Sequence, residues 1–161
     1  MEKEEIRRKI INSTNQINHA NAVIARNYNR INALQREIEE LRVAKKSVKK
    51  VLNKLENGKS DTNSLINAVP GLSFIASSVL KTNLFRGVMD VINGNKYASA
   101  NNSVNNSLRK IDDEIRKKNM EIDSLKSEIS ASQSNINRYT KNKNYYSSLM
   151  REKGKKKWVH N

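Results

Sequence analysis

The sequence lacks cysteine and is poor in the residues that interrupt helices. Its 161 residues include 1 proline and 5 glycines, so few positions break a helix. Without cysteine, disulfides and thiolate metal ligands are excluded. The two histidines, His19 and His160, lie far apart, and no cluster of other metal ligands accompanies them. We therefore expect no metal, no cofactor and no small-molecule ligand.

Aromatic and apolar residues are also scarce. Only 5% of residues are aromatic and 36% are hydrophobic, which is too little for a thick globular core but enough for a narrow helical interface. Neither a Gly-x-Ser-x-Gly nucleophile motif nor a glycine-rich phosphate loop occurs. We therefore expect a protein that is not an enzyme, with no catalytic residues.

Long hydrophobic runs are missing as well. The longest, "VPGLSFIASSVL", covers residues 69–80 and is too short to cross a bilayer as one helix. The first residues, "MEKEEIRRKI", are charged and lack the apolar part of a signal peptide. The expected location is the cytoplasm, and export beside a partner by a non-Sec route stays open.

Positive charge is abundant and unevenly distributed. The net charge is +15, which suits an acidic protein, a nucleic acid or an anionic membrane. Residues 42–59 carry seven basic residues and one acid, Glu56. Such a run is often only a solvated helix face, but it can also attract an acidic partner. The predicted electrostatic docking residues are Lys45, Lys46, Lys49 and Lys50.

A seven-residue repeat of apolar residues runs through the first third of the chain. It places one set at Ile10, Ile17, Ile24, Ile31, Ile38, Lys45 and Leu52, and a second at Ile6, Ser13, Ala20, Asn27, Leu34, Leu41, Val48 and Leu55. The two sets occupy heptad positions a and d, which form the contact seam of a coiled coil. The repeat predicts a helix over about residues 3–57.

The same repeat returns near the end of the chain. Its two sets are Leu108, Ile115, Ile122, Ile129, Ile136, Lys143 and Met150, and Val104, Ile111, Lys118, Leu125, Ser132, Tyr139 and Tyr146. This repeat predicts a helix over about residues 100–152, followed by a basic tail at 153–161. Two matched seams favour an antiparallel hairpin.

A register for the hairpin follows from matching the two seams. We predict that the numbers of facing residues total about 156, so that Ile17 faces Tyr139 and Ile6 faces Met150. In this register Lys45 lies near Asp112 and Asp113, and Lys118 lies one turn from Glu37, Glu39 and Glu40. The seam residues Lys45, Lys118 and Asn27 are expected to fix the register, although a shift by one heptad stays open.

The connection between the two repeats, about residues 58–94, has a different pattern. "NGKSDTN" is typical of a loop, and Pro70-Gly71 opens an amphipathic pattern that ends at Asn93-Gly94. We therefore predict a loop and a shorter third helix in the connection. The predicted fold class is all-α, a long antiparallel helical hairpin with this third helix, in a single domain covering residues 1–161.

Several apolar residues lie outside the predicted seam. They are Val23, Tyr28, Val51, Tyr145 and Leu149. Because a long seam of only two helices is marginally stable, a helix from another chain is one candidate to cover these residues. The third helix of the chain itself is the other, although it is too short to cover the whole length.

The step Phe85-Arg86-Gly87, between two long helical segments, resembles the Trp-x-Gly element of the WXG-type superfamily of secreted helical hairpins. Residues 83–129, with their ladder of Ile111, Ile115, Ile122, Leu125 and Ile129, look most similar to the YwqH-like family. Members of that family accompany LXG polymorphic toxins of the type VIIb secretion system in Gram-positive bacteria.

The resemblance implies a targeting factor or chaperone that binds the helical LXG domain of a toxin, often beside a second small helical partner, and presents it to the type VII machinery. It implies a partner-binding role for Phe85 and Gly87, with Leu84 and Val88 beside them, although packing alone also explains these residues. No tyrosine near the C-terminus has an acid four residues later, so the family's export signal is expected on a partner.

Two other functions stay open at this stage. A membrane-active helical-hairpin toxin would use residues 69–80 as its hydrophobic tip. A basic coiled coil that binds nucleic acid would use the lysines and Trp158 of the tail. Nucleic acid is the less favoured partner, because no known recognition motif occurs and no aromatic residues interleave the basic ones.

Overall fold

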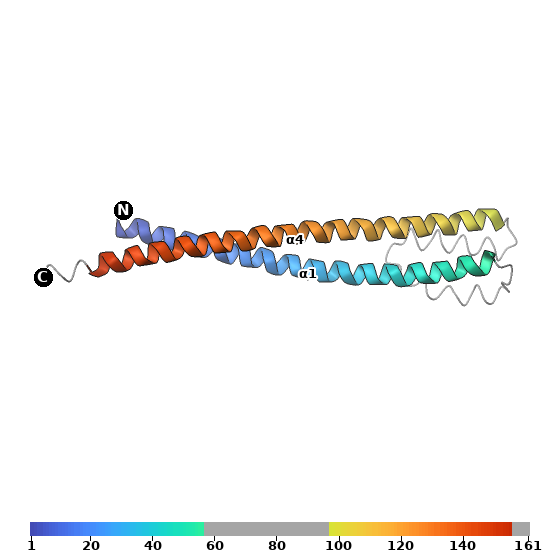
Figure 1. Cartoon of the computed structure of the whole chain (residues 1–161), viewed down its shortest axis with the longest axis horizontal. Helices are drawn as coiled ribbons and strands as arrows, with labels where there is room; N and C mark the ends of the chain where they lie inside the picture. Colours follow the sequence, from blue (N-terminus) through green and yellow to red (C-terminus); the bar gives the residue numbers. More distant parts are fainter. Residues whose placement is uncertain (57–96, 156–161) are drawn as a thin grey trace. The chain divides into compact units, whose positions relative to one another are not determined.

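Two long helices make up the part of the chain that the computed structural model describes, residues 1–56 and 97–155. They are α1 (Lys3–Glu56) and α4 (Tyr97–Lys155) (Figure 1). No strand occurs in these two ranges. The two helices pack against each other and run antiparallel, which confirms the all-α helical hairpin.

The composition of each helix explains its length. α1 contains neither glycine nor proline, and Glu4 and Glu5 lie in its first turn, where they interact favourably with the helix dipole. α4 contains one glycine, Gly154, in its last turn. The predicted third helix, with Leu84, Phe85, Gly87 and Val88, lies outside the described residues, as does the end of the basic tail from residue 156.

The chain divides into two compact units, which are described separately. The terminal unit consists of Met1–Asn32 and Ile122–Asn161, and the inner unit is Ala33–Glu121. In each unit one stretch of α1 lies beside one stretch of α4 (Figure 1). The described part of the inner unit is therefore residues 33–56 of α1 and 97–121 of α4.

The core of the terminal unit is narrow. Its buried residues are Ile6, Ser13, Ala20, Asn27, Ile31, Ile122 and Ile129, all of which belong to the predicted seam. The hydroxyl of Ser13 donates a hydrogen bond of 2.9 Å to the carbonyl oxygen of Lys9, one turn earlier. This local bond lets a small polar side chain occupy the seam without an unsatisfied group.

The core of the inner unit is wider than the sequence predicts. Its buried residues are Leu34, Ile38, Leu41, Ala44, Val48, Val104, Ser107 and Ile111. Ala44 and Ser107 stand one position before a seam residue, so a third heptad position is buried here. The Ser107 hydroxyl is satisfied by the carbonyl oxygen of Ser103 at 3.0 Å.

Polar contacts between the helices fix the register within each unit. In the terminal unit Asn27 bonds to Glu128 at 2.9 Å, and Lys153 bonds to the carbonyl oxygen of Met1. In the inner unit Lys45 pairs with Asp112, and Lys118 pairs with Glu37. The residue numbers of every pair total within two of 156, which confirms the predicted register and excludes a shift by one heptad.

Cysteine trapping tests this register in solution. The double variant Ile17→Cys, Tyr139→Cys is expected to form an intramolecular disulfide under mild oxidation, because facing seam positions approach within disulfide reach. The control pair Ile17→Cys, Ser132→Cys uses the same heptad positions one heptad away and should stay reduced. Non-reducing gel electrophoresis distinguishes the two, and preferential cross-linking of the control pair would contradict the register.

Candidate functional site

The structure separates the predicted partner-binding residues of the terminal unit into two sides. Val23 and Leu149 each stand one position before a seam residue, and both are half-buried. In an antiparallel pair of helices these positions share one side of the seam. Tyr145, one turn before Leu149, lies on the same side and is 59% exposed. Tyr28 is 50% exposed and occupies the heptad position on the opposite side.

We call the side that carries Val23, Tyr145 and Leu149 the open flank. Val23 and Leu149 are separated by roughly four helical turns, or about 24 Å, so a partner that touches both must be extended. Val51, the remaining apolar residue predicted outside the seam, belongs to the inner unit, and its side chain lies outside the described residues. One long helix suits a contact surface of this shape.

The seam of the terminal unit is itself only partly closed. Half-buried seam residues from both helices include Ile10, Ile17, Ile24, Leu125, Ile136, Tyr139, Tyr146 and Met150. Two helices alone bury the facing edges of such side chains and leave the outer edges in contact with water. Covering these edges would remove further apolar surface from water, which favours association.

One stretch of each helix in the terminal unit carries no charged residue, although Arg138, Lys141 and Lys143 of α4 lie opposite part of the α1 stretch. Residues 10–25 of α1 and 129–137 of α4 contain no Lys, Arg, Asp or Glu. The register places these two stretches at overlapping levels of the same pair of helices. The central parts of protein interfaces are depleted of charged residues, because charges are costly to desolvate. This composition therefore suits a buried contact.

Cations and tyrosines lie close together over several turns of the terminal unit. The ammonium of Lys9 lies 5.3 Å from the ring centre of Tyr146, and the guanidinium of Arg138 lies 4.9 Å from that of Tyr139. The rings of Tyr145 and Tyr146 meet edge to face at 5.3 Å. These contacts orient the rings. They were not among the predicted site residues, although the predicted register already places Lys9 at the level of Tyr146 and the other two contacts join neighbouring residues.

The inner unit carries a basic surface on α1. Residues 41–50 contain five basic residues and no acid. Arg42 pairs with Glu39 at 3.4 Å and Lys45 pairs with Asp112. Lys46, Lys49 and Lys50 are exposed, and none of them forms an ion pair in the part of the chain that the structure describes. The structure thus places Lys45 in the seam, whereas the other three predicted docking lysines face solvent.

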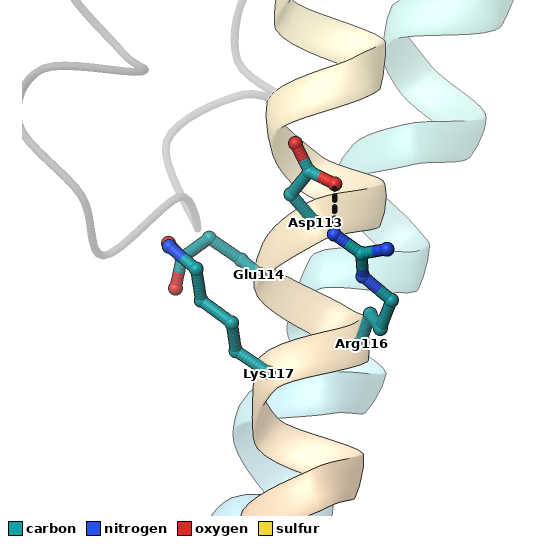
Figure 2. Close-up of polar contacts among 4 residues, drawn as sticks. All are labelled: Asp113, Glu114, Arg116 and Lys117. Atoms are coloured by element: carbon teal, nitrogen blue, oxygen red, sulfur yellow. Dashed lines mark hydrogen bonds and ion pairs between the residues drawn. The ribbon is translucent and has the colours of Figure 1, made fainter.

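The exposed charges of α4 in the same unit are balanced. Arg116 pairs with Asp113 at 3.2 Å, and Lys117 pairs with Glu114 at 3.3 Å (Figure 2). Each pair joins residues three positions apart on one helix, where opposite charges attract. These exposed pairs add little stability, but they cancel the local field of α4. The unbalanced positive charge of the inner unit therefore lies on α1.

The acidic residues and His19 of the described ranges 1–56 and 97–155 are spread along the two helices. No group of three or more His, Cys, Asp or Glu side chains gathers there in a way that could hold a metal ion. Neither α1 nor α4 has a stretch that is long and apolar enough to cross a membrane.

Comparisons with protein-family models, with curated proteins and with solved structures gave no match to the chain. The resemblance to the YwqH-like family stays a prediction that rests on the residues named above.

Proposed function

We propose that the protein is a non-enzymatic escort for a larger helical protein, which it binds along the open flank of the terminal unit. The half-closed seam of this unit supports the proposal most directly. Leu125, Tyr139 and Tyr146 of α4 are half-buried and occupy the seam position that adjoins the position of Leu149, so a helix laid along the flank would cover their exposed edges. The uncharged stretches 10–25 and 129–137 lower the desolvation cost of such a contact.

The identity of the partner is the finer part of the proposal. The Phe85-Arg86-Gly87 step and the isoleucine ladder resemble those of proteins that accompany LXG toxins. We therefore propose the helical LXG domain of a type VII-secreted toxin as the partner, with a second small helical protein beside it. The escort binds the toxin in the cytoplasm and delivers it to the type VII machinery. The escort then either leaves the cell with the toxin or stays in the cytoplasm.

Co-purification tests the partner. When the chain is co-expressed with the cognate LXG domain, we expect both to elute together in size-exclusion chromatography, and we expect export of the toxin to fail without the chain. An unrelated helical-hairpin domain of similar length serves as the control partner. If the chain elutes alone beside its cognate domain, the type VII assignment is wrong.

A pair of matched substitutions tests the flank. Tyr145→Glu introduces a charge on the open flank and is expected to weaken the complex at least ~10-fold. The variant loses an aromatic contact, and its carboxylate must be desolvated when the partner binds. Tyr28→Glu makes the same change at a similar exposure on the opposite side, and binding should change less than ~3-fold. Isothermal titration calorimetry measures both. An equal loss of affinity in the two variants would contradict the proposal that the partner binds on the open flank only.

A further inference from the structure

The basic surface of α1 in the inner unit forms a face with regular spacing. Arg42, Lys46, Lys49 and Lys50 are separated by four, three and one positions, so they lie together on one face of the helix, which begins beside the seam and turns outward. All four are exposed. Val43, which is 44% exposed, lies in the same face. We call these five residues the basic face.

Like charges at these spacings repel one another. Arg42 and Lys46 are four positions apart, as are Lys46 and Lys50, and such pairs destabilise an isolated helix. Of these four residues, only Arg42 pairs with an acid in the described ranges, namely Glu39. The α4 helix of the same unit avoids this problem because opposite charges lie three positions apart at residues 113–117 and pair with each other (Figure 2). A face needed only for solubility has no reason to concentrate one sign, whereas a face that binds an anion does.

We propose that the basic face binds an acidic helix of a partner protein, with carboxylates spaced three and four positions apart along one side. The face extends over about 12 Å, which is a little over two helical turns. Because lysine side chains are flexible and their ammonium groups need no bidentate geometry, they can form ion pairs with carboxylates at these spacings. Complementary charge would make association fast and sensitive to salt.

The composition of the basic face favours a protein over other anions. Val43 offers an apolar contact beside Arg42 and Lys46, which suits an amphipathic helix. No aromatic residue lies within residues 41–50, so the stacking platform typical of single-stranded nucleic acid is absent from this stretch. The bulky apolar residues with which an interfacial helix enters a membrane are also absent from the exposed positions of this stretch.

This inference goes beyond the escort function, because it concerns a different surface and needs no LXG domain. The probe is a fluorescent helical peptide of about 20 residues with glutamates three and four positions apart on one side. A second peptide has glutamine in place of each glutamate. In fluorescence anisotropy with the full chain at low salt, we expect the glutamate peptide to bind and the glutamine peptide to fail.

Two triple variants separate the basic face from general positive charge. Lys46→Gln, Lys49→Gln, Lys50→Gln is expected to weaken peptide binding about 10-fold, because three exposed charge pairs are lost. Arg109→Gln, Lys110→Gln, Lys117→Gln removes the same charge from α4 of the same unit and should weaken it less than ~3-fold. Glutamine has nearly the helix propensity of lysine and arginine, so both variants are expected to keep their helical circular dichroism.

Three outcomes would overturn the inference. One is no binding of the glutamate peptide at low salt, and another is an equal loss in the two triple variants. The third is tighter binding, through Lys46, Lys49 and Lys50, of a double-stranded DNA fragment or of phosphatidylserine vesicles than of the peptide. Loss of LXG-domain binding alone would leave the inference standing, because the peptide assay does not involve the open flank.

Discussion

Replacing Ile111 by alanine is expected to lower the free energy of unfolding by about 2–5 kcal/mol. Ile111 is a seam residue of α4 in the inner unit and has no exposed surface. The substitution removes apolar contacts and leaves a cavity that two long, stiff helices can close only in part. Urea denaturation followed by far-ultraviolet circular dichroism measures the change.

The matched control for this substitution is Met120→Ala on the same helix and in the same unit. Met120 is 58% exposed, so its truncation should change the free energy of unfolding by less than about 0.5 kcal/mol. Both changes introduce alanine, a strong helix former, and therefore differ mainly in burial. Similar losses in the two variants would mean that the seam of the inner unit is not the core of this pair of helices.

The hairpin could be predicted from the sequence because its signal repeats many times. Each heptad gives the same information about which side of the helix is apolar, so single exceptions such as Ser13 and Lys45 do not obscure the pattern. The register could be predicted for a related reason. Only one alignment of the two ladders brings Lys45 to Asp112 and Lys118 to Glu37 while the apolar residues also match.

The extent of burial could not be predicted in the same way. A heptad pattern names the seam positions but not how far the contact spreads to their neighbours. In the inner unit it spreads to Ala44 and Ser107, whose small side chains carry little hydrophobic signal. In the terminal unit Ile10, Ile17 and Ile24 stay half-buried, although they are the same residue type as the buried Ile31 and Ile38.

The candidate site was predicted in part. Sequence reasoning named Val23, Tyr28, Tyr145 and Leu149 as one set, since all lie outside the seam. Which side of the seam each residue occupies depends on the pairing of α1 with α4, and the register assigns Tyr28 to the side opposite the other three. Exposed Ile11, Val43 and Met120 were not in the predicted set. In the sequence they are marked only by being apolar residues at heptad positions outside the seam.

The two candidate surfaces differ in their chemistry. The open flank of the terminal unit carries Val23, Tyr145 and Leu149 together with a few charged residues such as Lys9, so it suits a contact whose strength comes mainly from burial. The basic face of the inner unit is charged and hydrated, so it suits a contact that contributes association rate and partner choice more than affinity. Raising the salt concentration should therefore weaken binding at the basic face more than binding at the open flank.

Replacing Asn27 by aspartate is expected to destabilise the terminal unit by about 2–3 kcal/mol at neutral pH. Asn27 is a seam residue with 2% of its surface exposed, and its side-chain nitrogen donates a hydrogen bond to an oxygen of Glu128 at 2.9 Å. The substitution removes this donor. It also places a buried carboxylate against a second carboxylate, so both desolvation and repulsion oppose folding.

The pH dependence of the loss identifies its cause. Burial raises the pKa of the introduced carboxyl group in the folded chain above its value of about 3.9 in the unfolded chain. The folded state therefore binds more protons between these two values, and stability relative to the wild type rises as the pH falls through the folded pKa. The deficit should be full at about pH 7 and small at about pH 4.

Asn27→Leu is the neutral control, and its difference from the wild type should not follow this titration. A deficit for Asn27→Asp that is equal at both pH values, or absent at pH 7, would show that position 27 is open to water and that the seam of the terminal unit is not closed at this level.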